Sequence, residues 1–248
     1  MGRKSNNKGK ERREEKRLAQ KEHQAKLARS LEAIQKANQL EDPMEPFPAF
    51  RKFQKNGIDA ELYVKRVIHL DEAIKEWIFD LEKRNMKQKY DDCSWGWRDW
   101  KKKDELMHDS AWYLIAQTID GVKIGFSHFR FDLESEIEVL YCYELQIEPE
   151  YVGKGLGKFM MQILELIAFT NNMRKVVLTI LKNNPCSNFF KHIKYQIDEP
   201  SLCHKDEASH PYEILSKVNK KLISTEEMEA HHGHGHSHNQ SHCCPGHH

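Results

Sequence analysis

The sequence predicts a mixed α/β (α+β) fold, with a central, mostly antiparallel mixed sheet flanked by helices and an extra N-terminal helical segment. Three observations predict it. Apolar runs of strand length alternate with stretches that are apolar on one helical face. Asp120-Gly121 joins two such runs, which is typical of a β-hairpin. A glycine-rich turn at residues 153–157 joins an apolar strand to a long amphipathic helix.

The chain divides into three parts by composition. Residues 1–42 interleave Arg and Lys with Glu and favour a helix, which we expect to be solvated and to pack on the domain only toward its end. Alternatives for this basic segment are a nuclear import signal or a contact with the ribosome or nucleic acid. Prolines at 43, 46 and 48 end it, so the folded domain is predicted to span residues 43–220. Residues 221–248 form a His/Cys-rich tail that we expect to be disordered, without a specific metal site.

Pattern and turn signals predict the first half of the domain. Asn56-Gly57 is a turn signal, and residues 58–68 follow it as a strand. Asp71 is placed to cap a helix, because apolar residues at 74, 77, 78 and 81 share one helical face. The aromatic stretch from Tyr90 to Trp100 lacks a period, and we interpret it as a loop that runs into a short helix ending near Met107.

The second half alternates strands and helices. A hairpin of strands 111–118 and 123–131 is followed by an acidic link at 132–138, a central strand at 138–147 and a helix at 155–170. A buried strand at 175–181, a short helix at 187–193 and a final hairpin of 195–197 with 212–216 complete the predicted sheet.

Composition excludes some classes of protein. No run of about 18 apolar residues exists, so no membrane span is expected. The first residues lack the apolar stretch of a secretory signal, and the six cysteines show no disulfide framework. We therefore expect reduced thiols and a location in nucleus and cytoplasm. We also expect the protein to be a monomer.

The glycine-rich turn is a candidate anion site, since the first amides of a helix lack partners and attract phosphates. A Walker loop requires Ser or Thr where Phe159 follows Lys158, and the dinucleotide fingerprint requires a different glycine interval. The stretch Val152-Gly153-Lys154-Gly155-Leu156-Gly157 instead resembles the pyrophosphate loop of the GCN5-related N-acetyltransferases. Val152 departs from this pattern, because Gln or Arg is usual there.

Five segments extend the resemblance over nearly the whole chain. They are Ser94-Trp95-Gly96-Trp97, residues 127–132, residues 139–144, residues 154–159 and residues 212–216. They are similar to the N-alpha-acetyltransferase D family, the histone-specific N-terminal acetyltransferases. The resemblance implies transfer of acetyl from acetyl-CoA to the N-terminal Ser of histones two-A and four, by direct attack in a ternary complex. The alternatives are an acetyltransferase for other N-termini, lysines or small amines, and a non-catalytic chromatin or ribosome adaptor.

The resemblance also assigns residues to the co-substrate, acetyl-CoA. It implies a pyrophosphate cradle made by Gly153, Lys154, Gly155, Leu156, Gly157 and Lys158. The pantetheine contacts are assigned to the backbone of Leu145, Gln146 and Ile147, with Thr179 and Asn184 nearby.

Glu144 is the candidate general base and Tyr143 the candidate acid or orienting group. A terminal α-amine has a pKa of about 7.7 to 8, against about 10.4 for lysine, so a carboxylate acting through a water suffices to deprotonate it. Strand alternation would place these two side chains on opposite faces unless a bulge re-aims one. Because the family reaction forms no acyl-enzyme, Cys142 is expected to be a buried apolar residue instead of a nucleophile.

The resemblance places substrate recognition in acidic and aromatic groups. It implies that Asp132, Leu133 and Glu134 bind the arginine or the terminus of a Ser-Gly-Arg-Gly tail. A pocket too small for a bulky first residue is walled by Tyr90, Trp95, Tyr141, Tyr143 and Tyr212.

Overall fold

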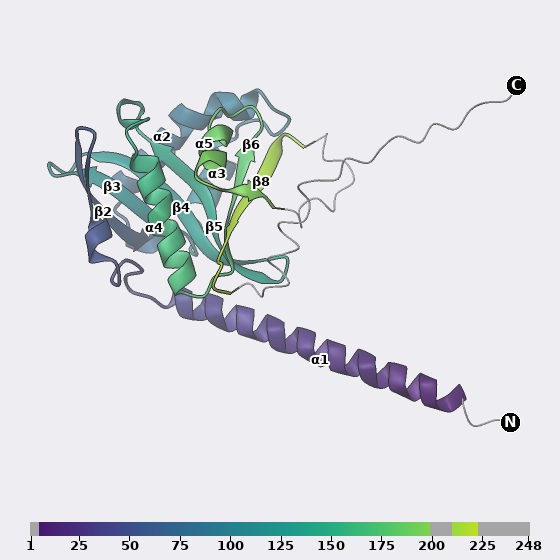
Figure 1. Ribbon diagram of the computed structural model, residues 1–248. Helices are drawn as coiled ribbons and strands as arrows, with labels where there is room; N and C mark the ends of the chain where they lie inside the picture. The colour runs from purple at the N-terminus through teal and green to yellow at the C-terminus, as the bar shows by residue number, and fades with distance from the viewer. Residues whose placement is uncertain (1–4, 199–209, 223–248) are drawn as a thin grey trace, which may run out of the picture.

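The computed structural model describes residues 5–198 and 210–222, which form one eight-stranded sheet with helices on both faces (Figure 1). The strand order is β1-β2-β3-β4-β5-β6-β8-β7, and every neighbouring pair is antiparallel except β5 and β6. The elements are α1 (Ser5–Asn38), η1 (Pro48–Arg51), β1 (Lys52–Lys55), β2 (Ile58–Arg66), η2 (Val67–His69), α2 (Glu72–Asp91), α3 (Asp99–Leu106), β3 (Trp112–Thr118), β4 (Lys123–Glu134), β5 (Ile137–Ile147), η3 (Pro149–Tyr151), α4 (Leu156–Thr170), β6 (Lys175–Leu181), α5 (Ser187–His192), β7 (Gln196–Ile197) and β8 (Tyr212–Val218).

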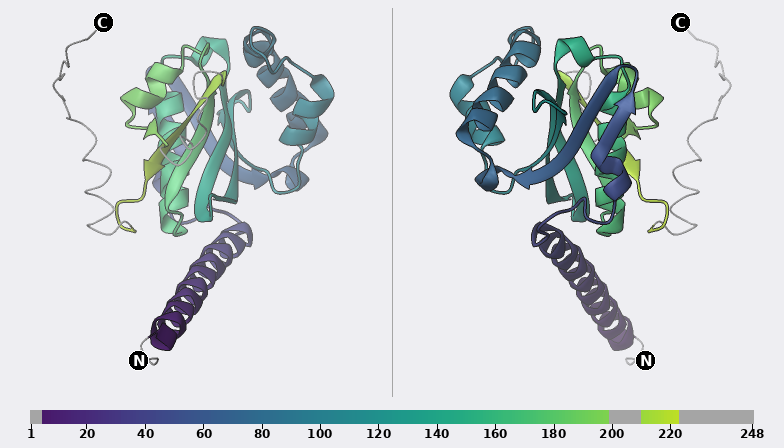
Figure 2. Two further views of the ribbon diagram at one scale, coloured as in Figure 1. Left: turned by 90° about the vertical axis from the view of Figure 1, so that its right-hand side faces the viewer. Right: turned by 90° about the vertical axis from the view of Figure 1, so that its left-hand side faces the viewer.

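The sheet separates two apolar cores. On one face, α4 buries Leu156, Met160, Ile163 and Ile167 against the strands, as its period of 3.6 predicts. The opposite face is covered by α2 and α3, which stand apart from α4 and α5 in Figure 2. The mixed sheet flanked by helices confirms the predicted fold class. The functional side chains described below lie on the α2–α3 face.

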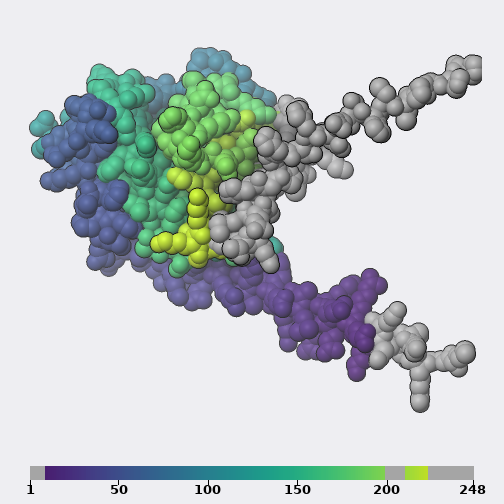
Figure 3. Space-filling view, viewed as in Figure 1, coloured from purple at the N-terminus to yellow at the C-terminus, as the bar shows by residue number. Residues whose placement is uncertain are grey.

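Helix α1 projects from the base of the domain, and only its last turns pack against it (Figures 1 and 3). From residue 9 onward its side chains are largely exposed up to Ser30, which is buried and donates a hydrogen bond to Glu138 (2.5 Å). Ala37 is fully buried in the core on the α4 face. The sequence explains this change, because Arg, Lys and Glu dominate the projecting part and large apolar residues become frequent only from Leu27 onward.

Two predicted connections differ in the structure. The acidic link at 132–138 is instead a tight hairpin, because β4 runs to Glu134 and β5 begins at Ile137. Ser135 and Glu136 make the turn with positive φ angles of 49° and 65°. Acidic residues here alternate with apolar ones, a period-2 pattern that the high charge obscured. Tyr90 lies in the last turn of α2 instead of in a loop.

One strand escaped sequence analysis. Strand β1 has four residues, Lys-Phe-Gln-Lys, with Phe53 alone buried, and it pairs with β2 at the edge of the sheet. Such short polar edge strands carry almost no hydrophobic signal. The strand nonetheless matters for the site, since the turn that follows it contacts the glycine loop.

Some sequence expectations fall outside the described residues. They include the His/Cys-rich part of the tail beyond residue 222. Within residues 5–198 and 210–222, no helix combines the length and apolar character needed to cross a bilayer. In the same ranges, no three His, Cys, Asp or Glu side chains are grouped so as to hold a metal ion.

Candidate active site

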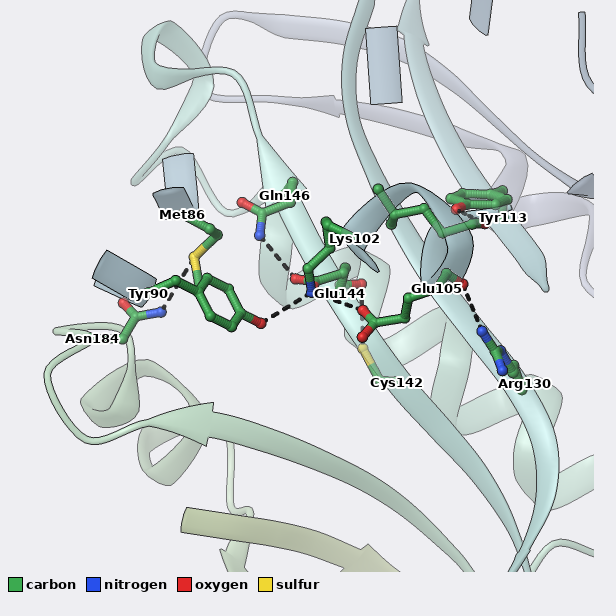
Figure 4. Close-up of polar contacts among 11 residues, drawn as sticks. Met86, Tyr90, Lys102, Glu105, Tyr113, Arg130, Cys142, Glu144, Gln146 and Asn184 are labelled. Carbon is green, nitrogen blue, oxygen red and sulfur yellow. Dashed lines mark hydrogen bonds and ion pairs between the residues drawn. The ribbon is translucent and has the colours of Figure 1, made fainter. Parts of the chain in front are cut away.

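A β-bulge in β5 determines which side chains reach the site. His128 of β4 pairs with Glu144, whereas the next residue, Phe129, pairs with Cys142, so Tyr143 is the extra residue. The bulge places Tyr143 and Glu144 on the same face, toward α2 and α3, where Glu144 bonds to Lys102 of α3 (Figure 4). Without the bulge, strand alternation would place the candidate acid and the candidate base on opposite faces of the sheet.

Cys142 points the other way, into the core on the α4 face. Its Sγ lies 3.4 Å from the hydroxyl of Ser127, and burial raises the pKa of its thiol to about 12. A thiol held protonated in this way is a poor nucleophile. The structure therefore supports the expectation that Cys142 is a buried apolar residue.

Glu144 is held by two donors in a nearly dry environment. Its side chain is 7 % exposed. Lys102 donates to Oε1 over 3.1 Å, and the side chain of Gln146 donates to Oε2 over 3.1 Å. The carboxylate is therefore fixed in direction, with its charge partly balanced by one ammonium group.

Lys102 joins several groups into one buried cluster. Its ammonium also donates to Glu105 (2.8 Å) and to the hydroxyl of Tyr90 (3.1 Å). Burial lowers the pKa of Lys102, but the neighbouring groups, Glu144 first among them, together outweigh burial, so the pKa of Lys102 is raised. Glu82 of α2 is fully buried next to this cluster. Its pKa is raised well above the usual value, mainly by burial and secondly by the charge of Glu144.

Tyr143 is held between two side chains of β4. Its ring stacks on His128 with centroids 4.9 Å apart, and the guanidinium carbon of Arg130 lies 4.4 Å from its ring centroid. Arg130 Nε donates to His128 Nε2 (3.2 Å), which places the imidazole proton on Nδ1. Burial lowers the pKa of His128, so this ring is neutral. Burial raises the pKa of Tyr143, while Arg130 opposes that rise.

The aromatic residues predicted to wall the substrate pocket come from α2, β5, β8 and the loop between α2 and α3. Trp95 lies between Tyr90 and Tyr212, with ring centroids at 6.1 Å and 5.0 Å. Tyr141 packs on Tyr143 at 4.9 Å, and its hydroxyl lies 2.5 Å from that of Thr179. Burial raises the pKa of Tyr141 to about 12, so it stays a neutral phenol.

The predicted acidic residues lie at the far end of the same face. Strand alternation puts Asp132 and Glu134 on the side of Arg130, and turns Leu133 to the opposite side. Asp132 is exposed and accepts a hydrogen bond from the amide of Leu133 (2.8 Å). Both carboxylates are therefore placed beyond the tyrosines, toward the end of the sheet where β4 turns into β5.

The glycine loop has the backbone that an anion cradle requires. Gly153 and Gly155 have φ angles of +77° and +94°, a left-handed conformation that side chains disfavour. Gly155 caps α4 without a side-chain hydrogen bond, so the first amides of this helix lack a side-chain cap. A Cβ at Gly157 would lie 3.2 Å from Ile147. Asn56, in the turn after β1, donates to the carbonyl of Lys154 (2.8 Å) and tethers the loop.

The strand edge predicted to bind pantetheine is open. Pairing between β5 and β6 ends at Cys142 and Leu178, so Leu145 to Ile147 have β4 as a partner on one side only. The carbonyl of Ile147 accepts a hydrogen bond from Asn85 (3.2 Å). Together with the glycine loop, this edge fits a phosphate group joined to a chain of amides.

Asn184 and Thr179 have local partners. The Asn184 side chain accepts a hydrogen bond from the amide of Cys186 (3.2 Å) at the start of α5. It also lines a hollow of about 360 Å³ with Lys182 and Lys191. The hydroxyl of Thr179 faces Tyr141, as described above. Both residues lie on the β6 side of the open edge, and their contact with pantetheine stays a prediction.

Four residues of the site were missed from the sequence: Glu82, Lys102, His128 and Arg130. Lys102 stands in a run of three lysines, and only the fold shows that the middle one is buried. Glu82 did carry a signal, because it follows Leu81 on the apolar face of α2, one turn after Ile78. Burying an acidic side chain at a core position costs free energy unless it is paired or protonated, so such a residue in an apolar helix face is a signal.

The conformation of Gly155 leads to a prediction. The change Gly155→Ala puts a Cβ on a left-handed residue, which costs about 1–2 kcal/mol of stability, and it displaces the start of α4. We expect a higher KM for acetyl-CoA in steady-state assays. Gly121→Ala is the matched control, since its φ of +82° carries the same strain in a distant hairpin. An equal rise in KM in both variants would contradict a specific role for the loop.

Known proteins share part of this sequence and fold. Residues 70–194 match the family described as "Acetyltransferase (GNAT) family". Similar solved structures include an N-acetyltransferase of Thermoplasma acidophilum in complex with coenzyme A, at 15% identity, covering 64% of this chain and 99% of that chain with a TM-score of 0.47. Another is Arabidopsis thaliana Naa50 in complex with a bisubstrate analogue, at 15% identity, covering 63% and 98% with a TM-score of 0.44. These likenesses are too low to bear on substrate choice.

The family match covers the parts of the chain that build the site. It begins before α2 and ends after α5, so it includes the bulged strand, the glycine loop and α4. The fold and acetyl-CoA as co-substrate are thereby confirmed. The chain belongs to the GNAT family of acetyltransferases.

Proposed function

We propose that this protein transfers the acetyl group of acetyl-CoA to the α-amine of the N-terminal Ser of histones two-A and four. The observation that carries the proposal is the bulge, which puts Tyr143 and Glu144 on one face with an aromatic wall and an acidic pair. The sequence segments that resemble the histone-specific N-terminal acetyltransferases support the same substrate.

In the proposed reaction, Glu144 accepts one proton from the substrate ammonium group through a water molecule. The neutral amine then attacks the thioester carbonyl carbon, a C–N bond forms, and the C–S bond breaks. Tyr143 donates its phenolic proton to the leaving thiolate and recovers one from the new amide nitrogen. Burial keeps Tyr143 protonated at neutral pH, since it raises the pKa of the phenol.

Substrate selection is assigned to the two ends of the same face. Asp132 and Glu134 would bind the arginine at the third position of a Ser-Gly-Arg-Gly tail by charge-assisted hydrogen bonds. Tyr90, Trp95 and Tyr212 would surround the small first residue and exclude larger ones. The protein should therefore prefer peptides that have both a small first residue and an arginine at the third position.

The proposal predicts a strong dependence on the substrate arginine. A Ser-Gly-Arg-Gly peptide should be acetylated on its α-amine, and the Arg→Ala peptide should show a kcat/KM about tenfold lower or more, because a hydrogen bond to a charged group contributes about 1.5–3 kcal/mol. The double change Asp132→Asn with Glu134→Gln should reduce the difference between the peptides. Mass spectrometry of the product locates the acetyl group.

Glu136→Gln is the matched control for this experiment. Glu136 lies in the adjacent turn, is exposed, and pairs with His23 of α1 (2.7 Å). It should leave the preference for arginine intact. Acetylation of internal lysines alone would refute the proposed substrate and favour a different acetyl acceptor within the same family.

A further inference from the structure

Glu82 is a buried carboxyl group that the proposed reaction does not use. It lies on the core-facing side of α2 and has no solvent exposure. Neither of its carboxyl oxygens accepts a hydrogen bond from another group within the described residues. An ionised carboxylate without a donor is expensive in such a place, and it persists only if a proton or a partner relieves it.

The surroundings of Glu82 favour the neutral acid. Glu144 of β5 and Glu105 of α3 share a single ammonium group, that of Lys102. The other titratable groups near this cluster are Tyr90 of α2, Tyr113 of β3, and His128 and Arg130 of β4. Burial raises the pKa of both phenols and lowers that of His128, and Arg130 donates to the backbone carbonyl of Glu105 (2.6 Å). Three carboxylates with one ammonium would leave an excess of two negative charges, and a proton on Glu82 halves it.

The position of that proton follows from the neighbours. Asn85, one turn further along α2, donates to the side chain of Gln146 (3.0 Å), which in turn donates to Glu144 (3.1 Å), so α2 brings Glu82 next to the Glu144 carboxyl group. The charge of Glu144 adds to burial in raising the pKa of Glu82, and two carboxyl groups can bond to each other only through a proton. Glu144 already accepts hydrogen bonds from Lys102 at one oxygen and from Gln146 at the other. A third donor would complete its fixation.

We infer that Glu82 is a positioning residue, held as a neutral carboxylic acid whose O–H donates to the Glu144 carboxylate and keeps that base aimed at the substrate amine. This inference rests on the proposed role of Glu144 in acetyl transfer. Glu82 neither gains nor loses a proton during turnover. The substrate proton goes to Glu144 and from there to solvent.

Kinetics of two variants test the positioning role. Gln mimics the neutral acid and can donate to Glu144, so E82Q should keep at least about a third of kcat. Met fills the space without a donor, so E82M should lower kcat about tenfold or more, because a hydrogen bond to a charged group is lost. The KM for acetyl-CoA should stay within about twofold in both variants. A wild-type kcat in E82M, or equal losses in E82Q and E82M, would overturn the inference.

Stability as a function of pH tests the protonation state without any assay of activity. A raised pKa in the folded state means that the contribution of Glu82 to stability is complete below the unfolded value of about 4.5 and is lost as pH rises. The free energy of unfolding, measured with urea, should therefore fall in wild type relative to E82Q as pH rises from 5 to 8. The ratio of their unfolding constants should change by up to about tenfold per pH unit.

The stability measurement also separates the two proposals. A constant ratio between wild type and E82Q over this range would show that Glu82 is not held as a neutral acid, and it would overturn the inference even if E82M fails to fold. Absence of peptide acetylation by the wild-type protein would instead refute the proposed function and leave the ratio to decide the protonation state.

Discussion

Replacing Glu144 with glutamine is expected to lower kcat at pH 7 by about 10²–10⁴-fold, the usual contribution of a general base. Gln keeps the shape of the side chain but cannot accept a proton from the attacking amine. The loss should narrow at pH 9, since an α-amine with a pKa of about 7.7 to 8 is then already neutral. Steady-state rates with a saturating Ser-Gly-Arg-Gly peptide at both pH values measure this.

Glu105→Gln is the matched control for Glu144. Both carboxylates bond to Lys102, over 2.8 Å and 3.1 Å, but Glu105 is more exposed and does not lie on the bulged strand. It should reduce kcat far less than Glu144→Gln. A loss in Glu144→Gln that is independent of pH would indicate that Glu144 orients the substrate instead of deprotonating it.

The family resemblance predicted which strand carries the candidate acid and base, but the alternation of side chains did not predict how these residues are aimed. Period 2 alone places Tyr143 and Glu144 on opposite faces, and the register between β4 and β5 shows that Tyr143 is an extra residue. A bulge is a property of two paired strands, so one strand's pattern does not contain it. Recognition of the family fold was needed even to expect it.

Prediction was most successful where one element has a long and regular pattern. Helix α4 begins at Leu156 and ends at Thr170, close to the range expected from its apolar face. The glycine turn before it follows from residue type, because positive φ angles favour glycine. The sequence did not predict strand β1 or the hairpin at Ser135, because these segments are short or acidic and have no long regular pattern. They form by pairing with neighbouring strands.

The charges of the site could not be predicted, because they depend on packing between distant segments. Lys102 is separated from Glu144 by 42 positions, and neighbouring lysines on the same helix remain exposed. Arg130 is recognisable only once β4 and β5 are paired, when it lies over the ring of Tyr143. Sequence therefore proposed a candidate acid and a candidate base, whereas the structure shows which charged groups surround them.

Removal of Lys102 should produce the largest loss of stability. The change Lys102→Met leaves Glu144 and Glu105 without their shared cation, and breaking a buried ion pair in this way costs about 3–5 kcal/mol. Protonation neutralises unpaired carboxylates, so the loss in free energy of unfolding should become smaller from pH 8 toward pH 5. Urea unfolding at the two pH values measures it. Lys101→Met, an exposed change on the same helix, should alter stability by less than about 0.5 kcal/mol.

A double-mutant cycle separates the pair from the general loss of packing. If Lys102 and Glu144 interact directly, the combination of Lys102→Met with Glu144→Gln should be more stable than the sum of the single changes predicts, by about 0.5–3 kcal/mol. The reason is that Gln needs no counter-charge, so the second change removes part of what the first left unpaired. Additive losses would mean that Lys102 serves mainly Glu105 and Tyr90, and Glu144 would then depend on Gln146 and Glu82 for its position.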